Sequence, residues 1–346
     1  MPASTSAETT SQSNGLPQRP LPVMDLGPYL AGEPGALEAL AAKWREACEG
    51  LGFLCLVNHG LPQAEIDKME AAARRFHALP DAEKLKIKVN QHQRGFIPGK
   101  ATILTHSTYS ENKKLDSVEC LVVATDYPSD DPNVIAGKQF YSQNQWPEDL
   151  PGFREDVEAY MAEVVALCNR LLPVWAVSLD LQPDFFEPYF KNGYNYFRIA
   201  KYPKQPDAEE GQQGLGSHAD TGFMTFLPPA REAGLQVLDT DDTWFWPVVP
   251  DGAIILNIGW FLSRWTNDRF RATPHRVAPP KNDDRYSFAC FVNTSLDSEV
   301  ECLPTCTGPD DPPKYPRQSY WDFYQWYMKR SYAHYGKVGE GKDAAE

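Results

Sequence analysis

Three side chains of the sequence have the types and spacing to bind one metal ion. His218 and Asp220 lie two positions apart, and side chains at that spacing on a strand point to the same face. A second histidine, His275, follows after enough chain to cross a sheet or barrel and return. Two imidazoles and one carboxylate on one side of a metal leave its other positions open, as non-haem Fe(II) chemistry requires. The spacing therefore predicts a metal centre with room for reactants.

Arg285 and Ser287 form a second candidate pair, shortly after His275. On a strand they share one face. A guanidinium fork and a hydroxyl on one face make a receptor for a carboxylate, because the fork matches both carboxylate oxygens. The open metal positions and this pair together predict a site for a cosubstrate.

Other interpretations of the three metal-type side chains stay open on this evidence. They could form a hydrogen-bonded cluster in the core, or they could bind Zn(II) in a hydrolase. A jelly roll could also use the metal for binding or sensing without turnover.

The order H-x-D, then a distant H, then R-x-S resembles the 2-oxoglutarate and Fe(II)-dependent dioxygenases. The resemblance is to the branch that includes isopenicillin N synthase and the plant flavonoid and hormone oxygenases, and it covers roughly residues 21 to 300. H-x-D alone would be a weak signal, but the whole set is specific. The other matching segments are Pro22-Val23-Met24-Asp25-Leu26, Gly52-Phe53-Leu54, Val57-Asn58-His59-Gly60, Arg94-Gly95-Phe96, Asn257-Ile258-Gly259, Thr266-Asn267-Asp268 and Thr273-Pro274-His275-Arg276-Val277.

The resemblance implies Fe(II), O2 and 2-oxoglutarate as cosubstrate. In this family 2-oxoglutarate binds iron through its keto acid end, which would leave Arg285 and Ser287 to hold the far carboxylate. Tyr202 matches the family tyrosine that hydrogen-bonds the cosubstrate. Ala200 and Lys201 stand where Asn-Tyr is common in the plant enzymes, so this chain departs from the family there.

The implied activity is a 2-oxoglutarate-dependent oxidation of a small molecule, by hydroxylation, desaturation or cyclisation, with release of succinate and CO2. Isopenicillin N synthase and the ethylene-forming aminocyclopropane oxidases do not use 2-oxoglutarate, yet they also carry R-x-S. The motif therefore leaves open an Fe(II) oxidase without 2-oxoglutarate.

The strand that begins at Arg285 predicts part of the substrate site. If Arg285 and Ser287 face the cavity, alternation places Ala289, Phe291 and Asn293 on the same side. Phe291 matches a position where flavonoid-oxidising relatives stack an aromatic ring against the substrate.

On the preceding strand, an inward Tyr202 places Ala200 and Arg198 inward as well. We expect Arg198, Phe291 and Asn293 to contact a compact substrate with an apolar or planar body, whose anionic group pairs with Arg198. Arg198 could instead pair with one of the 47 acidic residues of the chain.

Composition sets the broad class. Hydrophobic residues make up 42% of the chain and aromatic residues 12%, too many for a disordered protein. The net charge of −14 disfavours nucleic acid and anionic membranes as partners. The apolar runs fall short of a membrane span, and the N-terminus has no signal-like core, so we expect a cytosolic protein. The sequence leaves the oligomeric state open and is compatible with a monomer. Seven cysteines, mostly within apolar segments, predict reduced core thiols.

The predicted fold is α+β with a mainly β core, a double-stranded β-helix (jelly roll) flanked by helices and preceded by an N-terminal α/β region. We expect a disordered tail over residues 1–20, the N-terminal dioxygenase region over 21–125, a linker loop and scaffold helix over 126–190, the jelly-roll core over 191–300, and a C-terminal loop and helix over 301–346. Hydrophobic periodicity predicts helices over 37–49, 64–78, 153–179 and 319–335. Alternation predicts strands over 22–26, 53–57, 119–123, 195–202, 222–227, 235–239, 244–249, 253–258, 276–278 and 286–293.

Three further histidines have simpler explanations than metal binding. His59 lies at a turn and is expected to make structural hydrogen bonds. His77, on a helix beside two arginines, is expected to be partly exposed. His106 lies in a polar loop segment and is expected to be an ordinary loop residue.

Overall fold

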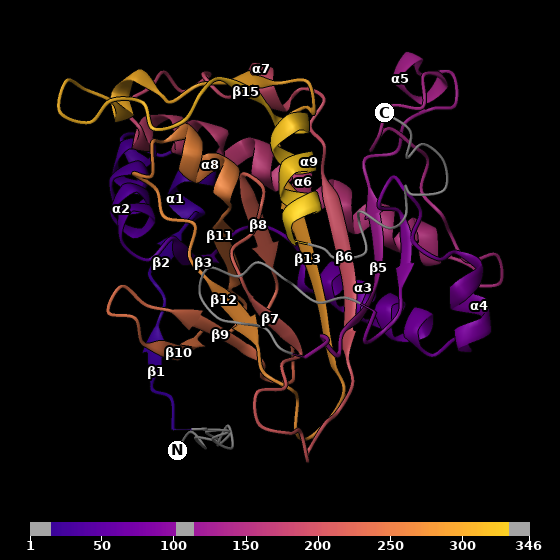
Figure 1. Ribbon diagram of the computed structural model, residues 1–346. Helices are drawn as coiled ribbons and strands as arrows, with labels where there is room; N and C mark the ends of the chain where they lie inside the picture. Colours follow the sequence, from indigo (N-terminus) through magenta and orange to yellow (C-terminus); the bar gives the residue numbers. More distant parts are fainter. Residues whose placement is uncertain (1–14, 102–113, 332–346) are drawn as a thin grey trace.

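The computed structural model describes residues 15–101 and 114–331 (Figure 1). Two main β-sheets lie at the centre of these residues, and helices pack around them. The larger sheet has the strand order β2-β3-β11-β8-β13-β6-β5-β4, and the smaller sheet has the order β1-β10-β9-β12-β7. A short pair, β14 with β15, forms a third sheet.

The strands of the larger sheet are β2 (Val23–Asp25), β3 (Phe53–Val57), β11 (Ile254–Ile258), β8 (Met224–Leu227), β13 (Arg285–Val292), β6 (Tyr196–Tyr202), β5 (Glu119–Ala124) and β4 (Gly95–Ile97). Those of the smaller sheets are β1 (Gln18–Pro20), β10 (Trp244–Val248), β9 (Leu235–Leu238), β12 (His275–Val277), β7 (Leu215–His218), β14 (Glu299–Val300) and β15 (Gln318–Ser319). The helices are α1 (Gly27–Leu30), α2 (Ala36–Gly50), α3 (Gln63–His77), α4 (Asp81–Lys86), α5 (Pro132–Ile135), α6 (Phe153–Ser178), α7 (Glu187–Phe190), α8 (Trp260–Trp265) and α9 (Tyr320–Ser331), with a 3-10 turn η1 (Pro304–Cys306).

The predicted jelly roll is confirmed. Strands β11, β8, β13 and β6 are neighbours in the larger sheet, and β10, β9, β12 and β7 are neighbours in the smaller one. Each of these pairings is antiparallel. Antiparallel sheets can bury one face each, so the two sheets share an interior between them (Figure 1).

The N-terminal region does not form a separate sheet. β3 pairs with β11 at one side of the jelly-roll strands, and β5 pairs with β6 at the other. β2 and β4 then extend the two sides further. The N-terminal half therefore widens the larger sheet and is held to the jelly roll by backbone hydrogen bonds.

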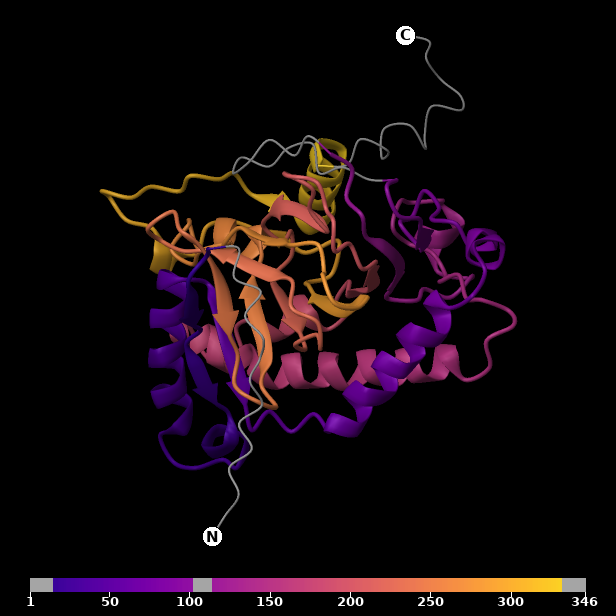
Figure 2. The same cartoon turned by 90° about the horizontal axis from the view of Figure 1, so that it is seen from below.

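Helix α6 is the scaffold helix that the sequence predicts. It packs against α2 and α3, and Figure 2 shows it running beside the strands. Trp44 of α2 meets Trp175 of α6 edge to face, with ring centroids 5.1 Å apart. By length and composition α6 also meets the criteria for a membrane-spanning helix, which the core helices of soluble proteins often meet too. Half of its most apolar window is buried inside the protein.

Two predicted features need correction. The predicted disordered tail extends too far, because Gln18–Pro20 form β1, which pairs in parallel with β10; residues 1–14 lie outside the described part. Strand β7 has no counterpart among the predicted strands, because the glycines and polar residues around it hide the alternation.

The simpler explanations for the histidines have mixed outcomes. Leu61 N–H donates to His59 Nδ1 at 3.1 Å, so His59 Nε2 carries the proton and donates to the Gly252 carbonyl at 2.9 Å, a structural role as predicted. His77 is not partly exposed: it is buried between α3 and the sheet, with Nδ1 2.9 Å from a Glu119 carboxylate oxygen. His106 lies outside the described residues. All seven cysteines are buried and free, as predicted.

Gly52 joins α2 to β3 at a point where no side chain fits. Its φ is +69°, and a Cβ there would lie 1.9 Å from the Arg271 carbonyl oxygen. The neighbouring Leu51 carbonyl accepts a hydrogen bond from the Thr273 hydroxyl. This turn therefore presses directly against the segment that leads into β12.

We expect Gly52→Ala to lower the free energy of unfolding by about 3 kcal/mol, because the new methyl adds a backbone clash to the strain of positive φ. Gly32→Ala is the matched control. Its φ of +71° carries the same strain, but no atom of the described residues lies within 4 Å of its Cβ position, so we expect the free energy of unfolding to fall by only about 1 kcal/mol. Urea unfolding of both variants checks this, and equal losses would show that the contact with Arg271 is unimportant.

Candidate active site

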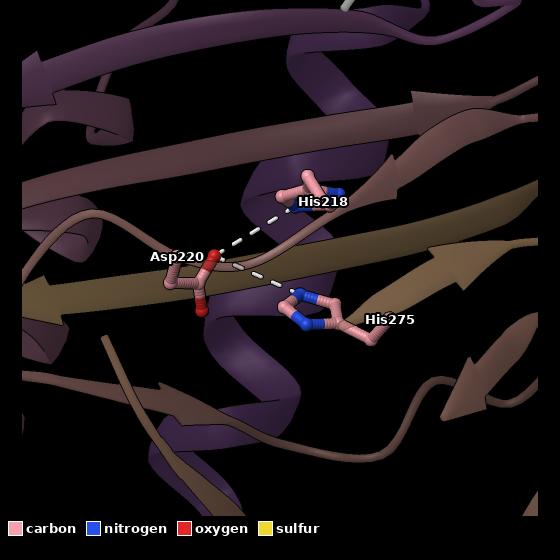
Figure 3. Close-up of side chains that lie close together, drawn as sticks. All are labelled: His218, Asp220 and His275. Carbon is pink, nitrogen blue, oxygen red and sulfur yellow. Dashed lines mark ion pairs between the residues drawn. The ribbon is translucent and has the colours of Figure 1, made fainter. Parts of the chain in front are cut away.

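His218 and His275 face each other across a strand pair. His218 ends β7 and His275 begins β12, and the two are partners in the antiparallel register of these strands. Their ring centroids are 4.4 Å apart. Asp220 lies in the loop just after β7, so strand alternation does not set its direction as the sequence analysis assumed. Figure 3 shows the three side chains pointing toward one another.

The three groups converge on one point. Asp220 Oδ1 lies 3.7 Å from Nε2 of His218 and 3.7 Å from Nε2 of His275. One ligand atom from each residue falls within 4.8 Å of the others. The predicted triad is therefore assembled with nitrogen and oxygen donors at the spacing that a single metal ion needs.

Backbone carbonyls fix the orientation of both imidazoles. Nδ1 of His218 lies 2.8 Å from the Gly216 carbonyl oxygen, and Nδ1 of His275 lies 3.2 Å from that of Thr273. A carbonyl oxygen only accepts, so each Nδ1 carries the proton. Both Nε2 atoms are left with a free lone pair directed at Asp220 Oδ1, the arrangement typical of metal-binding histidines.

The Asp220 carboxylate is held by its other oxygen. Oδ2 accepts hydrogen bonds from the Thr225 hydroxyl and the Asn257 amide, each at 2.7 Å. Thr225 comes from β8 and Asn257 from β11, both in the larger sheet. The two sheets therefore cooperate, since one supplies the imidazoles and the other orients the carboxylate.

The charge states of the cluster suit a cation. Burial, and next the proximity of His275, lower the pKa of His218 to about 3, so its imidazole is neutral near neutral pH. Burial alone would raise the pKa of Asp220, but the two imidazoles and the bonds from Asn257 and Thr225 hold it below its usual value. The site thus combines a neutral nitrogen donor from His218 with the carboxylate anion of Asp220.

A cavity that opens to solvent contains this cluster. The paired strands β13 and β6 form one wall, and their register gives four cross-strand pairs along it. These pairs are Arg285 with Tyr202, Ser287 with Ala200, Ala289 with Arg198, and Phe291 with Tyr196, and all eight residues line the cavity.

Arg285 is a buried cation with unmade hydrogen bonds. Only 3% of its surface is exposed, and within the described chain its Nε and Nη1 have no hydrogen-bond partner. Its guanidinium carbon lies 5.0 Å from the centre of the Tyr202 ring. Burial lowers the pKa of Arg285, as expected for a cation removed from water. Gly234 makes room for it, since a Cβ there would lie 2.7 Å from Arg285 Cδ.

The other end of the wall is aromatic. Tyr196 and Phe291 stack with ring centroids 4.2 Å apart and an interplanar angle of 7°. Arg198 lines the same region, and its Nη2 donates to Cys120 Sγ at 3.4 Å. The structure thus places Phe291 and Arg198 on the cavity wall.

Asn293 does not belong to this wall, and its predicted contact with substrate is wrong. β13 ends at Val292, so the alternation stops before Asn293. The side chain is fully buried, with Oδ1 accepting from Phe223 N–H and Nδ2 donating to the Tyr194 carbonyl. Its amide holds the loop after β7 instead.

Several cavity residues were missed from the sequence. Gln93 and Ile97 reach the cavity from the N-terminal region, and Tyr324, Tyr327 and Met328 reach it from α9. Tyr324 and Tyr327 also belong to the hydrophobic core, so the aromatic residues of this helix indicate core packing when only the sequence is considered. Asn257 lies in a segment that resembles the family, which was a usable signal for its role at Asp220.

Comparison with known proteins agrees with this geometry. Residues 21–149 match the family described as non-haem dioxygenase in morphine synthesis N-terminal, and residues 192–294 match the 2OG-Fe(II) oxygenase superfamily. A 2-oxoglutarate-Fe(II) type oxidoreductase of Emericella nidulans, hxnY, is 33% identical over 319 residues, which cover 90% of each chain. The chain belongs to the 2OG-Fe(II) oxygenase superfamily.

Solved structures resemble this oxygenase over most of its length. JOX2, in complex with 2OG, Fe and JA, superposes with a TM-score of 0.75 at 28% identity, covering 92% of this chain and 88% of JOX2. The dioxygenase for auxin oxidation of rice superposes with a TM-score of 0.67 at 25% identity, covering 89% and 95%. The predicted family is confirmed, and this oxygenase is a 2-oxoglutarate and Fe(II)-dependent dioxygenase that acts on small molecules. The alternatives without 2-oxoglutarate or without turnover are not supported.

Proposed function

We propose that His218, Asp220 and His275 bind the Fe(II) of this oxygenase, and that Arg285, Ser287 and Tyr202 bind the far carboxylate of 2-oxoglutarate. The unmade hydrogen bonds of Arg285 carry the second assignment, because a buried guanidinium is costly unless an acceptor pairs with it. The inward lone pairs of the two histidines support the first. Both groups of residues line one cavity, as a shared reaction requires.

Iron and 2-oxoglutarate, when bound, supply the oxidising chemistry with O2 and release succinate and CO2. The residues of this chain have other tasks. Thr225 and Asn257 keep the Asp220 carboxylate directed inward, and the apolar wall excludes water from the reacting atoms. Arg285 sets the position of the cosubstrate relative to the metal residues.

We propose a compact substrate with an apolar or planar body, which packs against Phe291 and pairs an anionic group with Arg198. The stacked rings and the cation on the same wall support this class. The oxidation could end in hydroxylation, desaturation or ring closure. We also propose that the enzyme is cytosolic, and its net charge of −14 disfavours nucleic acid and anionic membranes as partners.

The metal assignment predicts two different effects. His275→Ala should abolish tight Fe(II) binding and turnover, because two ligands hold a labile ferrous ion poorly. Asn257→Ala keeps all three ligands but frees the carboxylate, so Fe(II) affinity should fall about 10- to 100-fold. Anaerobic Fe(II) titration measures both, with His92→Ala as a histidine control outside the cavity. Turnover with Zn(II) in the absence of oxygen would contradict the assignment.

The cosubstrate assignment predicts that Arg285→Ala loses 2-oxoglutarate affinity while Fe(II) binding survives. Removing a charge-assisted pair from a buried site should cost on the order of 2–5 kcal/mol of binding free energy. Calorimetry with 2-oxoglutarate and trapping of labelled succinate measure the loss. Arg276→Ala removes an arginine that stacks on Trp244 outside the cavity and is the control. An unchanged response to 2-oxoglutarate in Arg285→Ala would refute the assignment.

The substrate assignment predicts the behaviour of two wall variants. Once a metabolite that stimulates succinate release is found, Arg198→Ala and Phe291→Ala should each raise its Michaelis constant, because one loses the anion partner and the other the packing surface. Arg231→Ala, an exposed arginine paired with Glu70, should leave it unchanged. The idea fails for Arg198 if Arg198→Ala has the wild-type Michaelis constant for an anionic substrate.

A further inference from the structure

Gln93 enters the cavity from an unusual backbone position. It lies just before β4 with a φ of +59°, in the left-handed region that side chains other than glycine and asparagine seldom adopt. Glycine would take this conformation without steric cost. The presence of glutamine in this conformation therefore indicates that its side chain has a role of its own.

The bonds that hold this conformation do not use the Gln93 side chain. The Asn90 side-chain oxygen accepts from the N–H groups of His92 and Arg94 at 2.9 and 3.1 Å, and Gln93 N–H donates to the Asn90 carbonyl. Arg94 is completely buried and donates to the Phe140 carbonyl and the Tyr194 hydroxyl. Gln93 is therefore held rigidly on both sides while its carboxamide remains available.

The carboxamide of Gln93 has no hydrogen-bond partner among the described residues, and Gln93 lines the cavity. Gln93 is only 6% exposed, it lines the cavity that contains the metal residues, and its amide makes no hydrogen bond within residues 15–101 and 114–331. A buried polar group is usually paired, so an unpaired amide facing a binding cavity points to a ligand group.

Strand register places Gln93 at the substrate end. One row across the sheet runs from Ile97 through Cys120 and Ala200 to Ser287, near the cosubstrate residues. The next row on this face begins at Gly95 and passes through Arg198. Gln93 precedes β4 at its Gly95 end, and the adjacent Arg94 donates to the Tyr194 hydroxyl and the Thr125 carbonyl. These partners border the row that contains Tyr196, so Gln93 lies on the side of the stacked Tyr196 and Phe291.

We propose that Gln93 determines substrate specificity by hydrogen-bonding the polar edge of a planar ring, an N–H beside a C=O as in a lactam. A primary carboxamide presents an acceptor and a donor side by side, so it pairs twice with an edge of the complementary order. The anionic group of the same substrate belongs to Arg198, because an anion would leave the Gln93 oxygen unpaired. This inference rests on the proposed function, which places the substrate ring against Phe291.

Three matched acids test the proposal. They are 2-oxo-1,2-dihydroquinoline-4-carboxylate, its N-methyl derivative and 1-naphthoate, which share a bicyclic planar body and a carboxylate but differ in the amide edge. Their binding is measured anaerobically by calorimetry on the enzyme loaded with Fe(II) and 2-oxoglutarate, so no turnover is needed. We expect the wild type to bind the lactam roughly 10- to 100-fold more tightly than the other two.

Gln93→Met keeps the side-chain length and removes the amide, so it should bind all three acids with similar affinity. Gln91→Met makes the same change at an exposed position of the loop and should keep the lactam preference. If Gln93→Met does not fold, Gln93→Asn carries the test, because asparagine tolerates the left-handed backbone while its amide is one methylene shorter. Gln93→Asn should weaken binding of the lactam acid more than binding of the other two acids.

Two outcomes overturn the proposal. One is a wild type that shows no lactam preference, including one that binds none of the acids, and the other is a preference that survives in Gln93→Met. Binding of 2-oxoglutarate is measured in the same samples. If the wild type fails to bind 2-oxoglutarate, the proposed function itself is wrong, whereas normal 2-oxoglutarate binding without lactam preference refutes only the role of Gln93.

Discussion

The pairing of β7 with β12 is the interaction on which the site depends. It places His218 opposite His275, and the carbonyls that accept a hydrogen bond from each Nδ1–H come from the same two chain segments as the rings. Two imidazoles could otherwise point their lone pairs in many directions. Because β12 also pairs with β9, and the segment before it abuts Gly52, the position of His275 is fixed by three different parts of the chain.

The carboxylate of Asp220 depends on the opposite sheet. Thr225 and Asn257 belong to neighbouring strands, β8 and β11, and both donate to Asp220 Oδ2. The carboxylate is therefore oriented correctly only when the two sheets are in the correct relative position. The N-terminal strands pair with the outer sides of the same sheet and stiffen it. The helical and N-terminal parts of the fold thus support a catalytic centre to which they contribute few side chains.

Local sequence predicted those parts of the site that strand alternation governs. Arg285, Ser287 and Phe291 lie on one regular strand, so their common face could be inferred from spacing alone. The predicted inward position of Asn293 was wrong because β13 ends one residue earlier, and a strand end is not visible in the alternation itself. The predicted partial exposure of His77 was wrong because its burial results from packing of α3 on distant strands. Gln93 and the α9 residues reach the cavity through tertiary contacts, which spacing in the sequence does not encode.

The regular wall formed by β13 and β6 has an evolutionary consequence. Its residues repeat every second position, so Arg285 and Phe291 are separated by roughly 20 Å of extended strand. Substitutions near Phe291 can therefore accumulate without contact with Arg285, although Thr225, the cross-strand partner of Phe291, also orients Asp220. A lineage with this architecture can acquire a new substrate by drift at one end of a strand while the cosubstrate site at the other end is inherited unchanged.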